Sequence, residues 1–400
     1  MLCESASANL LEHTLALGER SMTARREPGD RLVQDQAATP APVIEAKGLK
    51  KHFPIDTGVI AALVRRGPPR TVKAVDGVDV SVSSRSIFGL VGESGSGKST
   101  LGMTLVRLYE PSAGSIFLSG EEVTHIHGDG LRRFRRRAQI IFQDPYGSLN
   151  PRLTVGEAVE EPLKIHGIGD RAERAVRVVE SLERVNLQPR HFLHRYPHEL
   201  SGGQRQRAVI ARTLVLKPDF VVADEPISML DVSIRAGILD LLETLSKDLG
   251  LGVLYVSHDI STVRYVCDRV AIMYLGVFVE HGETDEVIDH PAHPYTQSLM
   301  AAVPIADPTA ARKRVELPGE VPTPIDIPSG CRFRTRCPCV MDICLRVAPP
   351  WREVSPEHHV ACHLYQSSIT PTRGISTCRP KGGLLARPPE AGAAVKPAKQ

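Results

Sequence analysis

The stretch Gly92–Glu93–Ser94–Gly95–Ser96–Gly97–Lys98–Ser99–Thr100 decides how the rest of the chain is interpreted. It follows the apolar run 87–91 and precedes the helix-like run 101–108, which is the context that a phosphate-binding loop requires. The glycines allow backbone N–H groups to point inward toward anionic oxygens, and the N-terminus of the following helix adds partial positive charge. We therefore expect Lys98 to reach the β- and γ-phosphates of a bound nucleotide and the Ser99 hydroxyl to ligate Mg²⁺.

The composition is that of a globular protein and favours no nucleic-acid partner. The chain has 400 residues, of which 42% are hydrophobic and 24% charged, and its net charge is +3. No apolar run is long enough to span a bilayer, and Glu4 and Glu12 interrupt any signal-like N-terminus, which predicts a cytoplasmic protein. The basic run Arg132–Arg137 is interpreted as the solvated face of a helix.

The pattern divides the chain into an α/β core with additional regions. Residues 1–42 are predicted to be a disordered leader, and globular pattern begins at residue 43. Apolar residues alternate with polar ones from 74 to 82, as in a strand with one exposed face. Helical spacing, with a capping box at Asp170 and Glu173, predicts a helical subdomain over about 150–205. Proline and cysteine become frequent after about 286, and residues 366–400 are predicted to be a disordered tail.

Two short apolar runs end in polar residues that suit catalysis. Residues 220–223 are followed by Asp224–Glu225, and residues 252–256 are followed by Ser257–His258. Such runs are typical of parallel strands buried on both faces, and open α/β sheets bind ligands at the carboxyl ends of their strands. Asp224 can hold Mg²⁺ and Glu225 can orient the attacking water. The acidic pair could instead be solvated turn residues, but the upstream phosphate loop favours the functional interpretation.

A second anion site is predicted at Leu200–Ser201–Gly202–Gly203–Gln204–Arg205–Gln206–Arg207. Ser-Gly-Gly at the start of a helix offers backbone N–H groups and the positive end of the helix dipole. Two anion sites for one triphosphate are explained if they face each other across a dimer. The octet resembles the signature of ABC ATPases. The resemblance implies a RecA-like P-loop core with an antiparallel β subdomain and a helical subdomain over residues 43–285.

The resemblance also assigns roles to single residues. Phe53 resembles the aromatic residue that stacks on adenine, with an ordinary core phenylalanine as the alternative. Gln143 resembles the glutamine that senses Mg²⁺ and the transporter partner, and His258 resembles the switch histidine at the γ-phosphate. Glu225 resembles the catalytic base and Asp224 the magnesium carboxylate.

A narrower resemblance concerns residues 142–151, 293–296 and 328–331, which look like the ATPase subunits of oligopeptide/dipeptide permeases. That family imports peptides and, in some members, nickel or other small solutes. It implies a second ATPase subunit in a homo- or heterodimer, two transmembrane permease subunits, an extracytoplasmic solute-binding protein and a peripheral location on the cytoplasmic face of the inner membrane. The alternatives are a nickel or other small-solute importer, an exporter's ATPase, and a non-transport ABC ATPase in translation or DNA repair.

The small C-terminal region, residues 286–365, contains Cys331, Cys337, Cys344 and Cys362. Four thiolates in a cytoplasmic protein predict a metal site rather than disulfides. Their spacing is wider than that of zinc modules, and the family resemblance implies a [4Fe–4S] cluster. Cys339 is a fifth thiol nearby, which leaves one ligand assignment open. Buried reduced cysteines without metal are the alternative.

Overall fold

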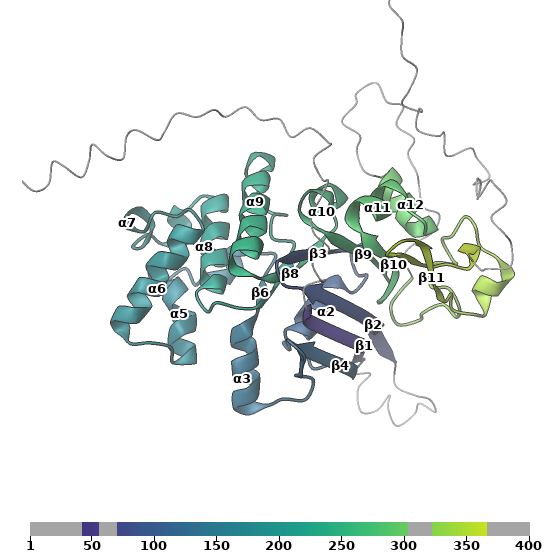
Figure 1. Ribbon diagram of the computed structural model, residues 1–400, viewed down its shortest axis with the longest axis horizontal. Helices are drawn as coiled ribbons and strands as arrows, with labels where there is room; N and C mark the ends of the chain where they lie inside the picture. The colour runs from purple at the N-terminus through teal and green to yellow at the C-terminus, as the bar shows by residue number, and fades with distance from the viewer. Residues whose placement is uncertain (1–41, 56–69, 303–321, 366–400) are drawn as a thin grey trace, which may run out of the picture. The chain divides into compact units, whose positions relative to one another are not determined.

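The computed structural model describes residues 42–55, 70–302 and 322–365 (Figure 1). The predicted leader, apart from Pro42, and the predicted tail lie outside these residues. The described chain is α/β, with an eight-stranded sheet, a four-stranded sheet and helices packed against them. The predicted fold class is confirmed.

The larger sheet carries the parallel core. Its strand order is β11-β12-β10-β9-β3-β8-β7-β6, and the five strands from β9 to β6 are parallel. The strands are β3 (Ser86–Val91), β6 (Ala138–Ile141), β7 (Phe220–Asp224), β8 (Gly252–Ser257), β9 (Arg269–Tyr274), β10 (Val277–Glu283), β11 (Trp351–Ser355) and β12 (His358–Ala361). Every residue of β7 and β8 is buried, as the sequence predicted for their apolar runs.

The smaller sheet is antiparallel and shares a core with the larger one. It consists of β1 (Pro42–Pro54), β2 (Thr71–Ser83), β4 (Ala113–Leu118) and β5 (Glu121–Glu122), in the order β2-β1-β4-β5. Helix α2 (Lys98–Leu105) contributes Leu101 and Leu105 to a buried cluster that also contains Val80 of β2 and Leu254 of β8. The two sheets and α2 therefore bury one continuous set of apolar side chains, which fixes the start of α2 against both sheets.

A helical unit lies between β6 and β7 in the sequence. It contains α5 (Val155–His166), α6 (Arg171–Arg184), α7 (Pro189–Phe192) and α8 (Gly202–Leu214), which group together in Figure 1. The predicted capping box begins α6, because the Asp170 carboxylate accepts from the Glu173 N–H and the Glu173 carboxylate accepts from the Asp170 N–H. Each such cap is worth about 1 kcal/mol.

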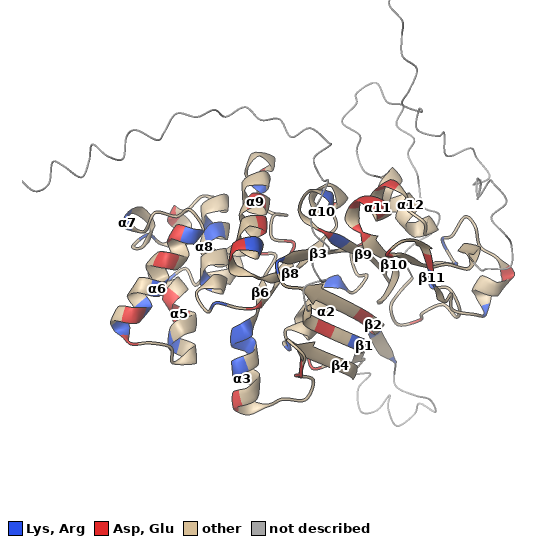
Figure 2. Cartoon of the chain, in the orientation of Figure 1, with Lys and Arg blue, Asp and Glu red and all other residues tan. Residues whose placement is uncertain are grey.

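The remaining helices are α3 (Gly128–Arg137), α4 (Pro145–Ser148), α9 (Val232–Leu249), α10 (Ile260–Val266), α11 (Thr284–Asp289) and α12 (Pro294–Ala301). Figure 2 shows the Lys and Arg residues of α3, and only Phe134 of this helix is buried. The basic run therefore lies on a largely solvated helix, as predicted. None of the helices that the structure describes is both long and apolar enough to cross a bilayer.

The C-terminal hairpin extends the core sheet. Strand β12 pairs antiparallel with β10, where Glu280 lies opposite Val360 and His281 lies opposite His359. Strand β11 then pairs with β12 at the edge. No sequence pattern predicts this pairing, since β10 and β12 are far apart along the chain and both strands are short.

Candidate functional site

The phosphate loop connects β3 to α2, and its glycines are required by close backbone packing. A Cβ atom on Gly97 would lie 2.0 Å from the backbone oxygen of Ala74, and one on Gly92 would lie 2.2 Å from that of Met273. Gly97 also has φ of +109°, in the region that favours glycine. The loop conformation thus depends on glycine both locally and through its neighbours.

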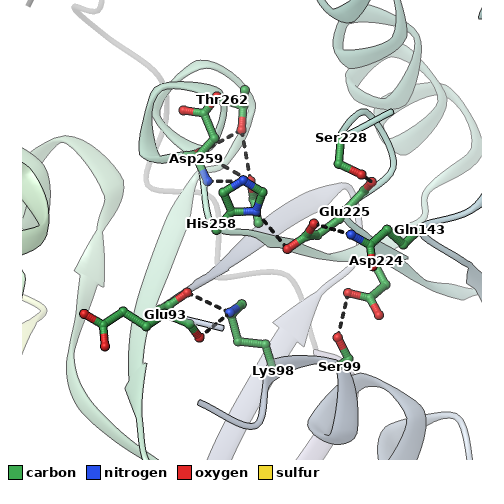
Figure 3. A network of polar contacts seen from close by, with 12 residues as sticks. Glu93, Lys98, Ser99, Gln143, Asp224, Glu225, Ser228, His258, Asp259 and Thr262 are labelled. Carbon is green, nitrogen blue, oxygen red and sulfur yellow. Dashed lines mark hydrogen bonds and ion pairs between the residues drawn. The ribbon is translucent and has the colours of Figure 1, made fainter. Parts of the chain in front are cut away.

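Lys98 lies within the loop, buried, and faces its backbone oxygens. The ammonium group donates to the oxygen of Gly92 at 2.7 Å and to that of Glu93 at 2.9 Å (Figure 3). Burial lowers the pKa of Lys98, and nearby carboxylates, of which Glu225 has the largest effect, act in the opposite direction. The cation is therefore held by the loop itself and faces the acidic strand end.

Ser99 and Asp224 meet at the end of β7. The Ser99 hydroxyl donates to the Asp224 carboxylate at 3.1 Å. Burial raises the pKa of Asp224, while the hydrogen bond from Ser99 opposes this rise. A hydroxyl and a carboxylate are ligands that suit Mg²⁺, so these two residues fit the predicted ion. Gln143, the third predicted ligand, bonds to Glu225 instead.

Glu225 is held from two sides. Gln143 Nε2 donates to one carboxylate oxygen at 2.7 Å, and His258 Nδ1 lies 2.9 Å from the other (Figure 3). Its φ is +47°, which is rare for a residue other than glycine and is typical of strained functional positions. The structure thus brings together the three residues predicted for catalysis. A pocket beside Glu225 is lined by His258 and by Arg235, which the sequence analysis did not single out.

The Ser-Gly-Gly segment begins α8 through a capping box. The Ser201 hydroxyl accepts from the Gln204 N–H, and the Gln204 side chain accepts from the Ser201 N–H. A Cβ atom on Gly203 would lie 2.5 Å from a side-chain carbon of Ile234 in α9, so the two helices approach closely there. Within the described residues, this segment forms no hydrogen bond to the phosphate loop of its own chain.

Phe53 lies near the end of β1 and is only partly buried. Its ring packs edge-on against Tyr109, with centroids 5.3 Å apart, and Lys51 Nζ lies 4.8 Å from its centroid. Phe53 does not belong to the buried core clusters, which disfavours the core alternative. His52 is hydrogen-bonded to Asp76 at 2.9 Å.

Two residues that contact the loop were not predicted. The Glu93 N–H donates to the Tyr295 hydroxyl at 2.9 Å, and the Arg336 guanidinium pairs with the Glu93 carboxylate. Tyr295 lies in the stretch 293–296, which the sequence analysis noted only for its family resemblance. No sequence signal connects Arg336 to the loop.

The structure does not support the predicted iron–sulfur cluster. Cys331, Cys337, Cys344 and Cys362 lie near one another, and burial followed by the charges of the other three raises the pKa of Cys362 to about 12. Across residues 42–55, 70–302 and 322–365, no group of three or more Cys, His, Asp or Glu side chains is arranged to hold a metal ion. Cys339, the fifth thiol, is disulfide-bonded.

The fold and the motifs together define an ABC-type ATPase, an enzyme that hydrolyses ATP. Residues 75–228 match the family model "ABC transporter", and residues 279–344 match "Oligopeptide/dipeptide transporter, C-terminal region". The oligopeptide transport ATP-binding protein AppF of Bacillus subtilis is 45% identical over 332 residues, which cover 82% of this chain and 99% of that protein. The chain therefore belongs to the ATP-binding proteins of oligopeptide/dipeptide ABC transporters.

Two solved structures have the same core. A dimer of the ATP-binding cassette MJ0796 in a post-hydrolysis state, bound to ADP and phosphate, has a TM-score of 0.52 and 29% identity, and the match covers 60% of this chain and 98% of that one. CbiO1 of Clostridium perfringens, part of an ABC transporter complex, has a TM-score of 0.54 and 26% identity, with 62% and 92% covered. Both likenesses agree with the α/β cassette described above.

Proposed function

We propose that this chain is the ATP-hydrolysing subunit of an importer of di- and oligopeptides. The observation that carries the proposal is the position of Glu225, whose carboxylate is held by Gln143 and His258 beside the Ser99–Asp224 pair. The family relationship supports peptides as the transported class, with nickel or another small solute as the alternative.

Each residue of the proposed ATP site has its own role. The backbone of residues 92–100 and the Lys98 ammonium bind the phosphates, and Phe53 stacks on adenine. Ser99 and Asp224 would hold Mg²⁺ with Gln143 nearby, and the ion would supply positive charge to the phosphate oxygens. Glu225 accepts a proton from the attacking water, and its two hydrogen-bond partners keep the carboxylate in one orientation.

Two such subunits sandwich ATP between the phosphate loop of one and residues 201–204 of the other. ATP binding closes the dimer, and loss of the γ-phosphate contacts reopens it. The partner subunit is a homologous or identical ATPase. The dimer moves two transmembrane permease subunits at the cytoplasmic face of the inner membrane, and an extracytoplasmic protein delivers the solute. We assign residues 43–285 to the nucleotide-binding domain and residues 286–365 to the C-terminal region. An iron–sulfur cluster is not part of this proposal.

Replacement of Glu225 with glutamine tests the catalytic assignment. The amide keeps the size of the side chain but cannot accept the proton, so we expect ATP turnover to fall about 10²–10⁴-fold while ATP binding is retained. The variant should accumulate as an ATP-bound dimer, measured by size-exclusion chromatography with light scattering. Glu243→Gln is the control, because Glu243 is partly exposed on α9 and, among the residues that the structure describes, pairs with Lys247. Near-normal turnover in Glu225→Gln would remove Glu225 from this role.

Peptide uptake tests the transport assignment. Cells that lack the gene should lose uptake of radiolabelled di- or oligopeptides, and the wild-type chain, but not Glu225→Gln, should restore it. Undiminished peptide uptake, with loss of nickel uptake instead, would favour the alternative solute.

A further inference from the structure

The phosphate loop contains an acidic residue, Glu93, which calls for a physical explanation. A loop that binds a triphosphate depends on positive potential from its N–H groups and its lysine. A carboxylate within the loop opposes that potential unless its charge is compensated. In Figure 3 the Glu93 side chain points away from Lys98, although the Glu93 backbone oxygen accepts a hydrogen bond from it.

The compensating charge comes from the C-terminal region. Arg336 Nη1 donates to one oxygen of the Glu93 carboxylate at 2.7 Å and Nη2 donates to the other at 3.1 Å. The pair is bidentate and poorly solvated, with 6% of the Arg336 side chain and 23% of the Glu93 side chain exposed. Screening by water and salt is weak in such an environment, so the pairing is strong and depends on the planar shape of the guanidinium.

The backbone of Glu93 is fixed by the same region. Its N–H group donates to the hydroxyl of Tyr295 in α12 at 2.9 Å. The rings of Tyr295, Tyr274 and Phe333 are buried against one another, with centroids 4.7 to 5.4 Å apart. Phe333 also accepts a backbone hydrogen bond from Arg336 at 3.0 Å, so the aromatic cluster holds the arginine in place.

We propose that Arg336 is a positioning residue for ATP binding: it holds the Glu93 carboxylate outside the phosphate loop and neutralises it. This inference rests on the proposed role of the loop in binding the ATP phosphates. Through Arg336, the C-terminal region would contribute to the nucleotide site, in addition to the sheet pairing between β10 and β12. Arg336 affects ATP binding by neutralising the negative charge of the Glu93 carboxylate.

A double-mutant cycle on the full-length chain tests the proposal. Arg336→Met leaves the Glu93 carboxylate unpaired beside the loop, and we expect the Kd of the ATP analogue adenylyl-imidodiphosphate, measured by calorimetry, to rise about tenfold. Removing the carboxylate as well, in Glu93→Gln/Arg336→Met, should return the Kd to within about threefold of wild type, because the repulsion is gone.

Arg334→Met is the matched control. Arg334 lies in the same segment but donates to Ser329 and to the backbone of Leu345, neither of which is in the loop. We expect its Kd and turnover to remain those of wild type. If Arg336→Met does not fold, as judged by its thermal unfolding, the cycle is run with Arg336→Gln, which removes the charge but keeps a hydrogen-bond donor for Glu93.

The outcomes separate this inference from the proposed function. Wild-type Kd in a folded Arg336→Met variant, or a double variant as weak as the single one, would overturn the role of Arg336. Lys98→Ala is measured alongside. If it binds the analogue as well as wild type does, the proposed function of the loop fails, whatever the cycle shows.

Discussion

The phosphate loop and the C-terminal region are built in opposite ways, although they meet at Glu93. The loop is a contiguous stretch whose chemistry follows from its own residue types and from the strand and helix beside it. The C-terminal region is held by contacts between residues far apart in the sequence, such as Arg336 with Glu93 and Arg332 with Asp76 at 2.5 Å. Local chemistry is therefore visible in the sequence of the first region, whereas the second can be understood only after the chain has folded.

The largest expected effect concerns Gly97, where local and tertiary requirements coincide. Gly97→Ala combines the strain of φ near +109°, worth about 1–3 kcal/mol, with a clash against the Ala74 backbone. We expect the free energy of unfolding, measured with urea, to fall by at least about 3 kcal/mol. Gly95→Ala is the control, because Gly95 has φ of +79° and open space around its Cβ position. Equal losses would mean that backbone strain alone matters.

The next effect lies in the C-terminal region and depends on pH. Burial lowers the pKa of His293 to about 4, with Glu280 acting in the opposite direction. The unfolded chain therefore binds more protons between pH 4 and about 6.5, so stability is complete above that window and falls as the pH is lowered through it. The shift corresponds to about 3 kcal/mol.

His293→Asn isolates this titration. His293 Nδ1 accepts from the Tyr295 N–H at the start of α12, and the asparagine side chain can accept the same hydrogen bond without becoming charged. Urea unfolding between pH 4 and 8 should show a smaller loss of stability toward acid in the variant than in wild type. Parallel curves of stability against pH for the variant and wild type would assign the acid sensitivity to other groups. His281 is the first of these to examine, because burial lowers its pKa to about 4 as well.

The next prediction concerns Phe53, which we assign to the nucleotide site. Aromatic stacking on a base is worth roughly 1–3 kcal/mol, so Phe53→Ala should weaken ATP binding about tenfold or somewhat more. Calorimetric titration measures the change, and Tyr109→Ala, which removes the ring packed against Phe53, serves as the comparison variant. Unaltered affinity in a folded Phe53→Ala protein would show that Phe53 has no role in adenine binding.

The smallest effect belongs to a purely local feature. Asp170→Ala removes the acceptor for the Glu173 N–H at the start of α6 and should cost about 1 kcal/mol of stability. Thermal unfolding of the variant measures this, with Asp170→Asn expected to keep most of the stability. A loss far above that value would mean that Asp170 has a tertiary role that its capping contacts do not reveal.

Several elements were predictable because their signals are short-range. The buried strands β7 and β8 follow from continuous apolar runs, the start of α6 from its capping pair, and the phosphate loop from its glycines and Lys98. The strand ends also placed Asp224 and Glu225 near the loop, since parallel strands carry their carboxyl ends to one edge of the sheet. The meeting of Ser99 with Asp224 is the direct result.

The sequence by itself determined the α/β class and the ABC-type ATPase family, because each depends on motifs whose residues lie a few positions apart. Only the tertiary structure decided that Gln143 bonds to Glu225, that β12 extends the core sheet through β10, and that Arg336 neutralises Glu93 from 243 positions away. Pairings of this kind are fixed by packing of the whole chain. The sequence around one partner does not indicate which residue the other partner is.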